Sequence, residues 1–159
     1  MAEQFTKSTE RFLTFYLGKE CYGVNIAAVK EIIALMKTTR IPKTPSYLKG
    51  VMNLRGVIIP VVDMRARFNM PTLEPTMRTA IIIVRIKNDN IGFIVDHVEE
   101  VCNASEEQMS EPASFGSEVD ANYIKKMIRT EKEVIMVMDI DSIFSEAELA
   151  ELEHTAKSA

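Results

Sequence analysis

The amino-acid sequence contains two copies of one pattern, and this repeat constrains the fold more than any other feature. LTFYLGKECYGVNIAAVKEI, from Leu13, matches IIVRIKNDNIGFIVDHVEEV, from Ile82, and YLKGVMNLRGVIIPVVDMRARF, from Tyr47, matches YIKKMIRTEKEVIMVMDIDSIF, from Tyr123. The first pair of segments is shifted by 69 residues and the second by 76. The matched positions include Gly23 with Gly92, Val29 with Val98, Glu31 with Glu100, Asp63 with Asp139 and Phe68 with Phe144. Glycine, aspartate and apolar matches in the same order indicate two copies of one unit.

Each copy is predicted to begin with two strands around a turn and to end with an apolar strand. The alternation of apolar and polar residues indicates strands at 13–17 and 21–24 in the first copy. β-Branched runs indicate strands at 80–86 and 91–95 in the second copy, around the turn residues 87–90. The closing strands are expected at 57–62 and 134–138. Because proline cannot donate a ladder hydrogen bond, Pro60 favours an edge or bulge position for the first of them.

The segments between these strands predict shorter elements. Residues 26–29 are expected to form a short turn that leads into a strand, on which Val29, Glu31, Ile33 and Leu35 would share one face. Asp63 and Asp139 follow the closing strands and are predicted to be the N-caps of helical turns. The proline- and threonine-containing stretch 70–77 would link the copies. A serine cap followed by SEAELAELE predicts a helix from 141 or 142 to 153, with a loose tail after it.

Composition excludes several classes of protein. The chain has 159 residues, 47% of them apolar and 26% charged, which suits one domain or a tight pair of small ones. The net charge is −4 without a basic stripe, so a nucleic-acid reader is not indicated. Two distant cysteines, two histidines and the absence of catalytic motifs give no reason to expect an enzyme, metal or cofactor. The polar start and the lack of a long apolar run predict a cytoplasmic protein without membrane insertion.

The copies differ at one turn, which reads Asn53-Leu54-Arg55-Gly56 in the first copy and Arg129-Thr130-Glu131-Lys132 in the second. Arg55 has two interpretations that are compatible. It is a turn arginine that pairs with Glu31 and fixes the loop, or it presents its planar fork to a partner amid apolar Val29 and Leu54. A rigid intramolecular pair can shape the surface that a partner meets.

The run KGVMNLRGVIIPVVDMRARF, together with FLTFYLGKECYGVNI before it and the Gly92 strand after it, resembles the CheW family of bacterial chemotaxis coupling proteins. The resemblance extends over residues 11–152, and its LRG-x-x-x-P-V-x-D block is specific. It implies a mainly β fold of two SH3-like five-stranded β-barrels that share a core, with a C-terminal helix. Residues 11–152 would form one domain of two intertwined subdomains, 11–70 and 78–152, between flexible tails at 1–10 and 153–159.

The resemblance also implies a non-catalytic adaptor that joins the cytoplasmic tips of methyl-accepting chemoreceptors to the regulatory domain of the histidine kinase CheA, in receptor arrays at the membrane. Carried over by position, the receptor-facing surface would comprise Val29, Glu31, Arg55, Val98 and Val101. The kinase-facing surface would comprise Leu35, Met36 and Lys37, and a second kinase contact would use Ser114 and Phe115. A groove lined by the three valines would accept the helices of a receptor tip.

Other functions have less support in the sequence. An enzyme in an unfamiliar barrel would need a cluster of titratable groups, and the sequence offers none beyond Glu31 and Arg55. A small-barrel nucleic-acid binder would need basic and aromatic residues together on one face. Within the family, the chain could be a domain of a CheV-type protein or of a kinase, or the adaptor of a chemosensory pathway that does not serve motility. An end at Ala159 leaves no room for a receiver or kinase domain and favours the free-standing adaptor.

Overall fold

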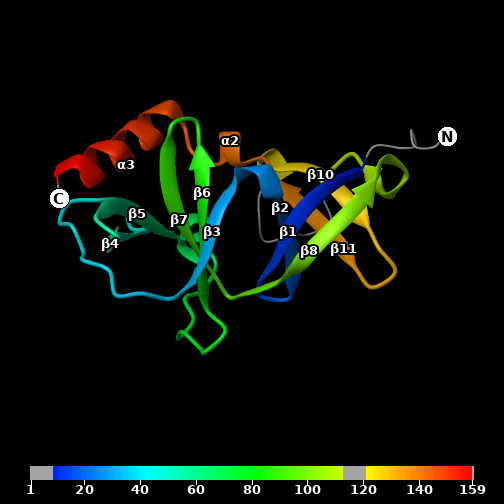
Figure 1. Ribbon diagram of the computed structural model, residues 1–159, viewed down its shortest axis with the longest axis horizontal. Coiled ribbons are helices and arrows are strands. Elements are labelled where there is room, and N and C mark those ends of the chain that lie inside the picture. Colours follow the sequence, from blue (N-terminus) through cyan, green and yellow to red (C-terminus); the bar gives the residue numbers. More distant parts are fainter. Residues whose placement is uncertain (1–8, 113–120, 159) are drawn as a thin grey trace.

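The computed structural model describes residues 9–112 and 121–158, which form two sheets side by side along the long axis (Figure 1). The strands are β1 (Thr9–Leu17), β2 (Glu20–Asn25), β3 (Val29–Ala34), β4 (Leu48–Leu54), β5 (Val57–Asp63), β6 (Ala80–Ile86), β7 (Asp89–Val95), β8 (His97–Ser105), β9 (Met109–Ser110), β10 (Ile124–Arg129) and β11 (Val134–Met138). The helices are α1 (Met64–Arg67), α2 (Ile140–Ile143) and α3 (Glu146–Ser158), with 3-10 turns η2 (Ile26–Ala28), η3 (Glu106–Gln108) and η4 (Ala121–Tyr123). The predicted mainly β fold with a C-terminal helix is confirmed.

The two repeats exchange their first hairpins. One sheet has the order β8-β1-β2-β11-β10-β9, and the other has the order β3-β6-β7-β5-β4. The hairpin β1–β2 of the first repeat therefore lies among strands of the second, and the hairpin β6–β7 of the second lies among strands of the first. Each hairpin joins the other repeat on both sides, through an antiparallel ladder (β1–β8 or β3–β6) and a parallel ladder in which Gly23 pairs with Val137 or Gly92 pairs with Val61. The ranges 11–70 and 78–152 are thus repeats in sequence, while each sheet draws strands from both.

The two expected five-stranded barrels are present as two curved sheets that differ from the expectation in detail. One sheet has six strands, because the two-residue strand β9 pairs with β10, and the ladders do not close into complete barrels. The first and last strands of this sheet are joined by chain continuity, from β8 through η3 into β9. In the other sheet, Thr39 forms an isolated bridge with Val51 of β4. Thr39 is the counterpart of Ser110, which pairs with Met127, so the repeats are closed in the same partial way.

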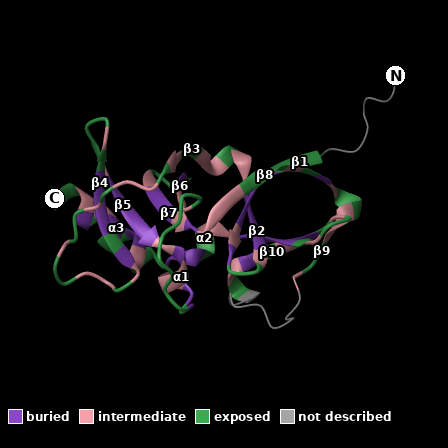
Figure 2. Cartoon of the chain, turned by 90° about the horizontal axis from the view of Figure 1, so that it is seen from below, coloured by how far each residue is buried: buried purple, intermediate pink, exposed green. Residues whose placement is uncertain are grey.

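Three apolar clusters explain why the sheets form one unit. Each sheet has a small apolar cluster of its own. The cluster of the six-stranded sheet includes Ile128, and that of the five-stranded sheet includes Ile81. The largest cluster lies between the sheets and takes residues from both hairpins, including Phe15, Tyr22 and Phe93. Figure 2 shows these buried strands in the middle and the exposed residues in the loops. The shared core implied by the resemblance is therefore present, and it is the largest of the three.

Two arginines of α1 connect the repeats. Arg65 donates to both carboxylate oxygens of Asp96, at 2.8 and 2.7 Å, and the backbone N–H of Gly18 donates to the same carboxylate at 2.8 Å. The Arg67 guanidinium lies 5.2 Å from the ring centre of Tyr47 and 5.5 Å from that of its repeat counterpart Tyr123. Arginine faces are well suited to such aromatic contacts. One short helix thus ties both repeats together at polar as well as apolar positions.

One strand prediction and one helix prediction were wrong in detail. β5 is an inner strand rather than an edge, but its ladder with β7 begins at Val61, so the missing N–H of Pro60 breaks no pair there. The C-terminal segment forms two helices, and α3 continues to Ser158 instead of ending at 153. Buried Leu152 and Thr155 hold this last part of α3. Thr9 and Glu10 belong to β1, while residues 1–8 and 159 of the expected tails lie outside the described residues.

The Arg65–Asp96 pair predicts a specific acid dependence of stability. Burial alone would raise the pKa of Asp96, but the hydrogen bonds from Arg65 and Gly18 outweigh burial and hold this pKa below its ordinary value of 3.8. The charged pair therefore stabilises the fold above about pH 4, and this contribution is lost as the pH falls through the lowered pKa. Asp96→Asn is expected to lower the free energy of unfolding by about 2–4 kcal/mol near neutral pH.

Urea unfolding of both proteins at a series of pH values checks this expectation. The deficit of Asp96→Asn should stay constant from neutral pH down to about pH 5 and shrink below about pH 4. A deficit that is independent of pH throughout would contradict a stabilising role for the carboxylate charge.

Gly50 is predicted to be essential for the partial closure at Thr39. Its φ is +149°, and a Cβ at this position would collide with the backbone carbonyl of Thr39. Gly50→Ala should destabilise the protein by about 2–4 kcal/mol, because a backbone clash must be relieved by moving the chain. Gly56→Ala is the matched control, since nothing lies within 4 Å of its Cβ and only its φ of +90° opposes the change. Equal destabilisation of the two variants in thermal unfolding would show that closure at Thr39 contributes little.

Candidate functional site

Strands β3 and β8 occupy equivalent positions in the two repeats and lie on the same face of the molecule, opposite α1 and α2 (Figures 1 and 2). Both strands contain a bulge at the same point of the repeat. The ladder between β3 and β6 shifts register between Val29 and Glu31, and the ladder between β1 and β8 shifts where Val98 and Val101 pair with Phe15 and Leu13. We call this surface the β3–β8 face. Its central residues are Val29, Ile32, Val98 and Val101.

The bulges bring apolar residues to the β3–β8 face. Val29 and Val98 are half-buried and pack against the shared core. Ile32 and Val101, which are also equivalent in the repeat, are 44% and 40% exposed. Isolated exposed side chains of this kind are ordinary, but a matched pair beside two half-buried valines forms an apolar patch from both sheets.

The bulge also corrects the predicted face of β3. Val29 pairs with Val84, which belongs to the shared core, whereas Glu31 pairs with Ile83, which belongs to the core inside its sheet. Because directly paired residues point to the same side of a sheet, Val29 and Glu31 lie on opposite faces of β3. Ile32 therefore joins Val29 on its side. Sequence reasoning omitted Ile32, although its match to Val101 in the repeat was a signal that could have found it.

Arg55 lies at the tip of the β4–β5 hairpin. Arg55 and Gly56 have φ values of +52° and +90°, and Leu54 pairs with Val57 around them. These values describe the two-residue turn that matches the twist of a hairpin. The side chain of Asn53 fixes the turn by accepting a hydrogen bond of 2.7 Å from the N–H of Gly56.

The predicted pair between Arg55 and Glu31 is present. The Arg55 guanidinium donates to Glu31 Oε1, and this hydrogen bond raises the pKa of Arg55 above its ordinary value. The side chain of Arg55 is nevertheless 69% exposed, and that of Glu31 is 34% exposed. The pair is thus held in place within the protein while most of the Arg55 side chain stays exposed, where a partner can reach it.

The residues predicted to face the kinase fall into two groups. Leu35 and Met36 follow β3, are half-buried, and pack against the core inside the five-stranded sheet, while Lys37 is exposed. Leu35 also lines a cavity of about 390 Å³ together with Leu73, which is 59% exposed. Ser114 and Phe115 lie outside the described residues.

The titratable groups within residues 9–112 and 121–158 form no group of three that could hold a metal ion. Burial raises the pKa of the Cys21 thiol to about 12, so this thiol stays protonated at neutral pH. Cys102 also has a raised pKa, because it is partly buried and lies near Glu100. None of the helices in the described part of the chain is long and apolar enough to cross a membrane.

Comparisons with known proteins agree with this architecture. The family model described as the CheW-like domain matches residues 11–148. The chain is 31% identical to "Chemotaxis protein CheW" of Rhizobium meliloti, over 92% of this chain and 95% of the relative, and 33% identical to "Chemotaxis protein CheW" of Klebsiella aerogenes, over 94% and 90%.

A solved structure is similar along most of its length. It is the crystal structure of the scaffolding protein TtCheW from Thermoanaerobacter tengcongensis, with a TM-score of 0.81 and 30% sequence identity, covering 89% of this chain and 96% of that one. The exchanged hairpins, the shared core and the LRG turn thus occur in a chain that belongs to the CheW-like domain family.

Proposed function

We propose that this chain couples the cytoplasmic signalling tips of methyl-accepting chemoreceptors to the regulatory domain of the kinase CheA. The relatives it matches over most of their length are chemotaxis proteins, and the solved structure is that of a scaffolding protein, so the chain is assigned to the non-catalytic chemotaxis coupling proteins. These matches favour a coupling protein over a domain of a CheV-type protein or a kinase. In this proposal the chain works in the cytoplasm and is recruited to receptor arrays at the membrane.

The observation that carries the receptor assignment is the apolar patch of the β3–β8 face, which borders the charged pair of Glu31 and Arg55. Half-buried Val29 and Val98 and exposed Val101 offer apolar contacts from both sheets. Exposed Arg55 adds a directed cation that Glu31 holds in place. A helix with apolar side chains spaced along one side fits such a surface, and a receptor tip built of paired helices presents such sides.

The kinase assignment is supported by the surface around Leu35, Met36 and Lys37. These residues follow β3 directly, so a kinase bound here would lie close to the receptor contact without covering it. The exposed apolar Leu73 beside the cavity at Leu35 extends this surface. The two binding surfaces share one strand, and a partner on one can influence a partner on the other through β3.

Arg55→Ala is expected to weaken binding of a receptor signalling fragment about fivefold or more, because it removes an exposed arginine anchor. Val29→Asp should weaken binding about tenfold or more, because it places a carboxylate at an apolar contact. Binding is measured by titration with the purified receptor fragment. Circular dichroism of each variant checks that the fold survives.

Arg55→Gly serves as a control for the turn, because glycine adopts the +52° φ of this position without strain. It should lose as much receptor affinity as Arg55→Ala, since both remove the guanidinium. Unchanged receptor binding by Arg55→Ala, Arg55→Gly and Val29→Asp together would sink the receptor assignment.

Lys37→Glu and Met36→Ala are expected to weaken binding of the CheA regulatory domain more than binding of the receptor fragment. Lys37 is exposed, so its substitution leaves the core intact. The reversed charge would repel those groups of the CheA regulatory domain that the lysine attracts. Parallel titrations with the two partners separate these effects. A loss of receptor affinity equal to the loss of kinase affinity would contradict separate surfaces.

A further inference from the structure

We propose that Lys132, held by Glu99 and Glu100, forms a second charged contact for the receptor tip on the β3–β8 face. It would act in the second repeat as Arg55 held by Glu31 does in the first, although the residue aligned with Arg55 is Glu131. This inference rests on the proposed function and adds residues that the resemblance did not supply. It follows from the repeat itself, taken together with the ion pairs that the structure shows.

The strand side of this second contact matches the first at two positions and differs at Glu99, whose counterpart is Lys30. Glu100 is the repeat counterpart of Glu31, and Val101 is the counterpart of exposed Ile32. The bulge of β8 is held by Thr14, whose hydroxyl donates to the carbonyl of Glu100 at 2.8 Å and accepts from its N–H at 3.1 Å. β8 therefore presents its acidic and apolar residues in the same order as β3.

The turn side of the contact is also equivalent. The β10–β11 turn occupies the place of the β4–β5 turn, because the pair Arg129 with Val134 corresponds to Asn53 with Ile58. Lys132 Nζ lies 3.7 Å from Glu99 Oε2 and 3.9 Å from Glu100 Oε2. Its side chain is 60% exposed, close to the 69% of Arg55. A cation at a hairpin tip is thus held against the bulged strand in both repeats.

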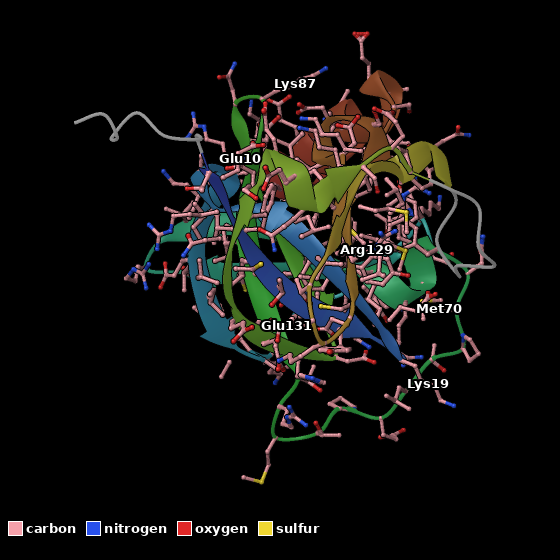
Figure 3. The ribbon with its side chains drawn as sticks, turned by 90° about the vertical axis from the view of Figure 1, so that its right-hand side faces the viewer. Glu10, Lys19, Met70, Lys87, Arg129 and Glu131 are labelled. Carbon is pink, nitrogen blue, oxygen red and sulfur yellow. The ribbon has the colours of Figure 1, made fainter. Side chains whose placement is uncertain are left out.

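The second turn is as firmly built as the first. The Thr130 hydroxyl accepts hydrogen bonds from the N–H groups of Lys132 and Glu133, at 3.2 and 3.1 Å, and Thr130 N–H donates to the carbonyl of Glu133 at 2.9 Å. The Tyr16 hydroxyl donates to the Glu133 carboxylate, which anchors the turn to β1. Figure 3 shows this hairpin running down the view, with Glu131 labelled near its turn. A contact on a pre-ordered turn loses little conformational freedom on binding.

The symmetry of the face points to the chemistry of its occupant. The backbones of two antiparallel helices are related by a local twofold axis, so a helical hairpin can present one helix to each half of such a surface. One helix would place its apolar side on Val29 and Ile32, and the other on Val98 and Val101. Acidic or amide side chains beside these stripes would meet Arg55 at one end and Lys132 at the other.

The occupant is therefore the paired-helix tip rather than a single helix. A single helix could engage one repeat and leave the other charged contact unused. The lysine differs from the arginine because it is a compact point charge without a planar fork. The two ends of the face are thus similar in position but different in chemistry.

Charge reversal at Lys132 tests this inference. Lys132→Glu is expected to weaken binding of a receptor signalling fragment more than about tenfold, because a carboxylate replaces the cation beside Glu99 and Glu100. Lys132→Ala should weaken it about threefold to fivefold, the range of an exposed charge pair. Lys125→Glu, an exposed lysine on the same strand β10 away from the turn, is the matched control and should change binding less than about twofold. The effect of Lys132→Glu should shrink as salt is raised, because salt screens exposed charges.

The outcomes separate this inference from the proposed function. Loss of binding by Arg55→Ala and Val29→Asp with normal binding by Lys132→Glu would overturn the second contact and leave the receptor assignment standing. Normal binding by all three would overturn both. A loss of affinity in Lys125→Glu equal to that in Lys132→Glu would also overturn the inference, because it would reflect net charge alone. Thermal unfolding of each variant verifies that the fold is intact.

Discussion

The structure depends on two short parallel ladders, which join Gly23 to Val137 and Gly92 to Val61. Together with the antiparallel ladders β1–β8 and β3–β6, they let each repeat complete the sheet of the other, so neither sheet can form from one repeat alone. The close approach of Ile135 and Ile81 to the two glycines shows why these positions carry no side chain: a Cβ would lie 3.1 Å from the one and 2.9 Å from the other. A half of about 70 residues would be marginally stable on its own, and the shared core makes the pair one unit.

The same exchange creates the candidate binding surface. Since the hairpins cross between sheets, β3 and β8 become edge strands on one face, and both carry a bulge at the same place in the repeat. The apolar residues of this face are nearly symmetric, but its charged residues are not, because Arg55 stands at one end and Lys132 at the other. Apolar symmetry supplies contact area, and the charge difference can fix the direction in which a pair of helices binds.

Much of this architecture could be predicted from the sequence, and the failures have clear physical causes. Strand positions and the repeat follow from local alternation, and the short turn before Val29 and the cap at Asp63 were confirmed. Which hairpin pairs with which strand depends on contacts between residues far apart in sequence, which a local pattern does not contain. A bulge at Lys30 leaves no mark either, since an exposed lysine suits any strand, and so Val29 and Glu31 were assigned to one face. The end of α3 was missed because its polar residues give little sign of the packing that holds Thr155.

Reconstitution with a receptor signalling fragment and a CheA kinase tests the coupling function, with kinase activity measured with and without this chain. We expect that the chain makes kinase activity depend on the receptor fragment, and that neither the chain nor the fragment alone has this effect. Kinase activity that responds equally to the receptor fragment whether or not the chain is present would contradict a coupling function.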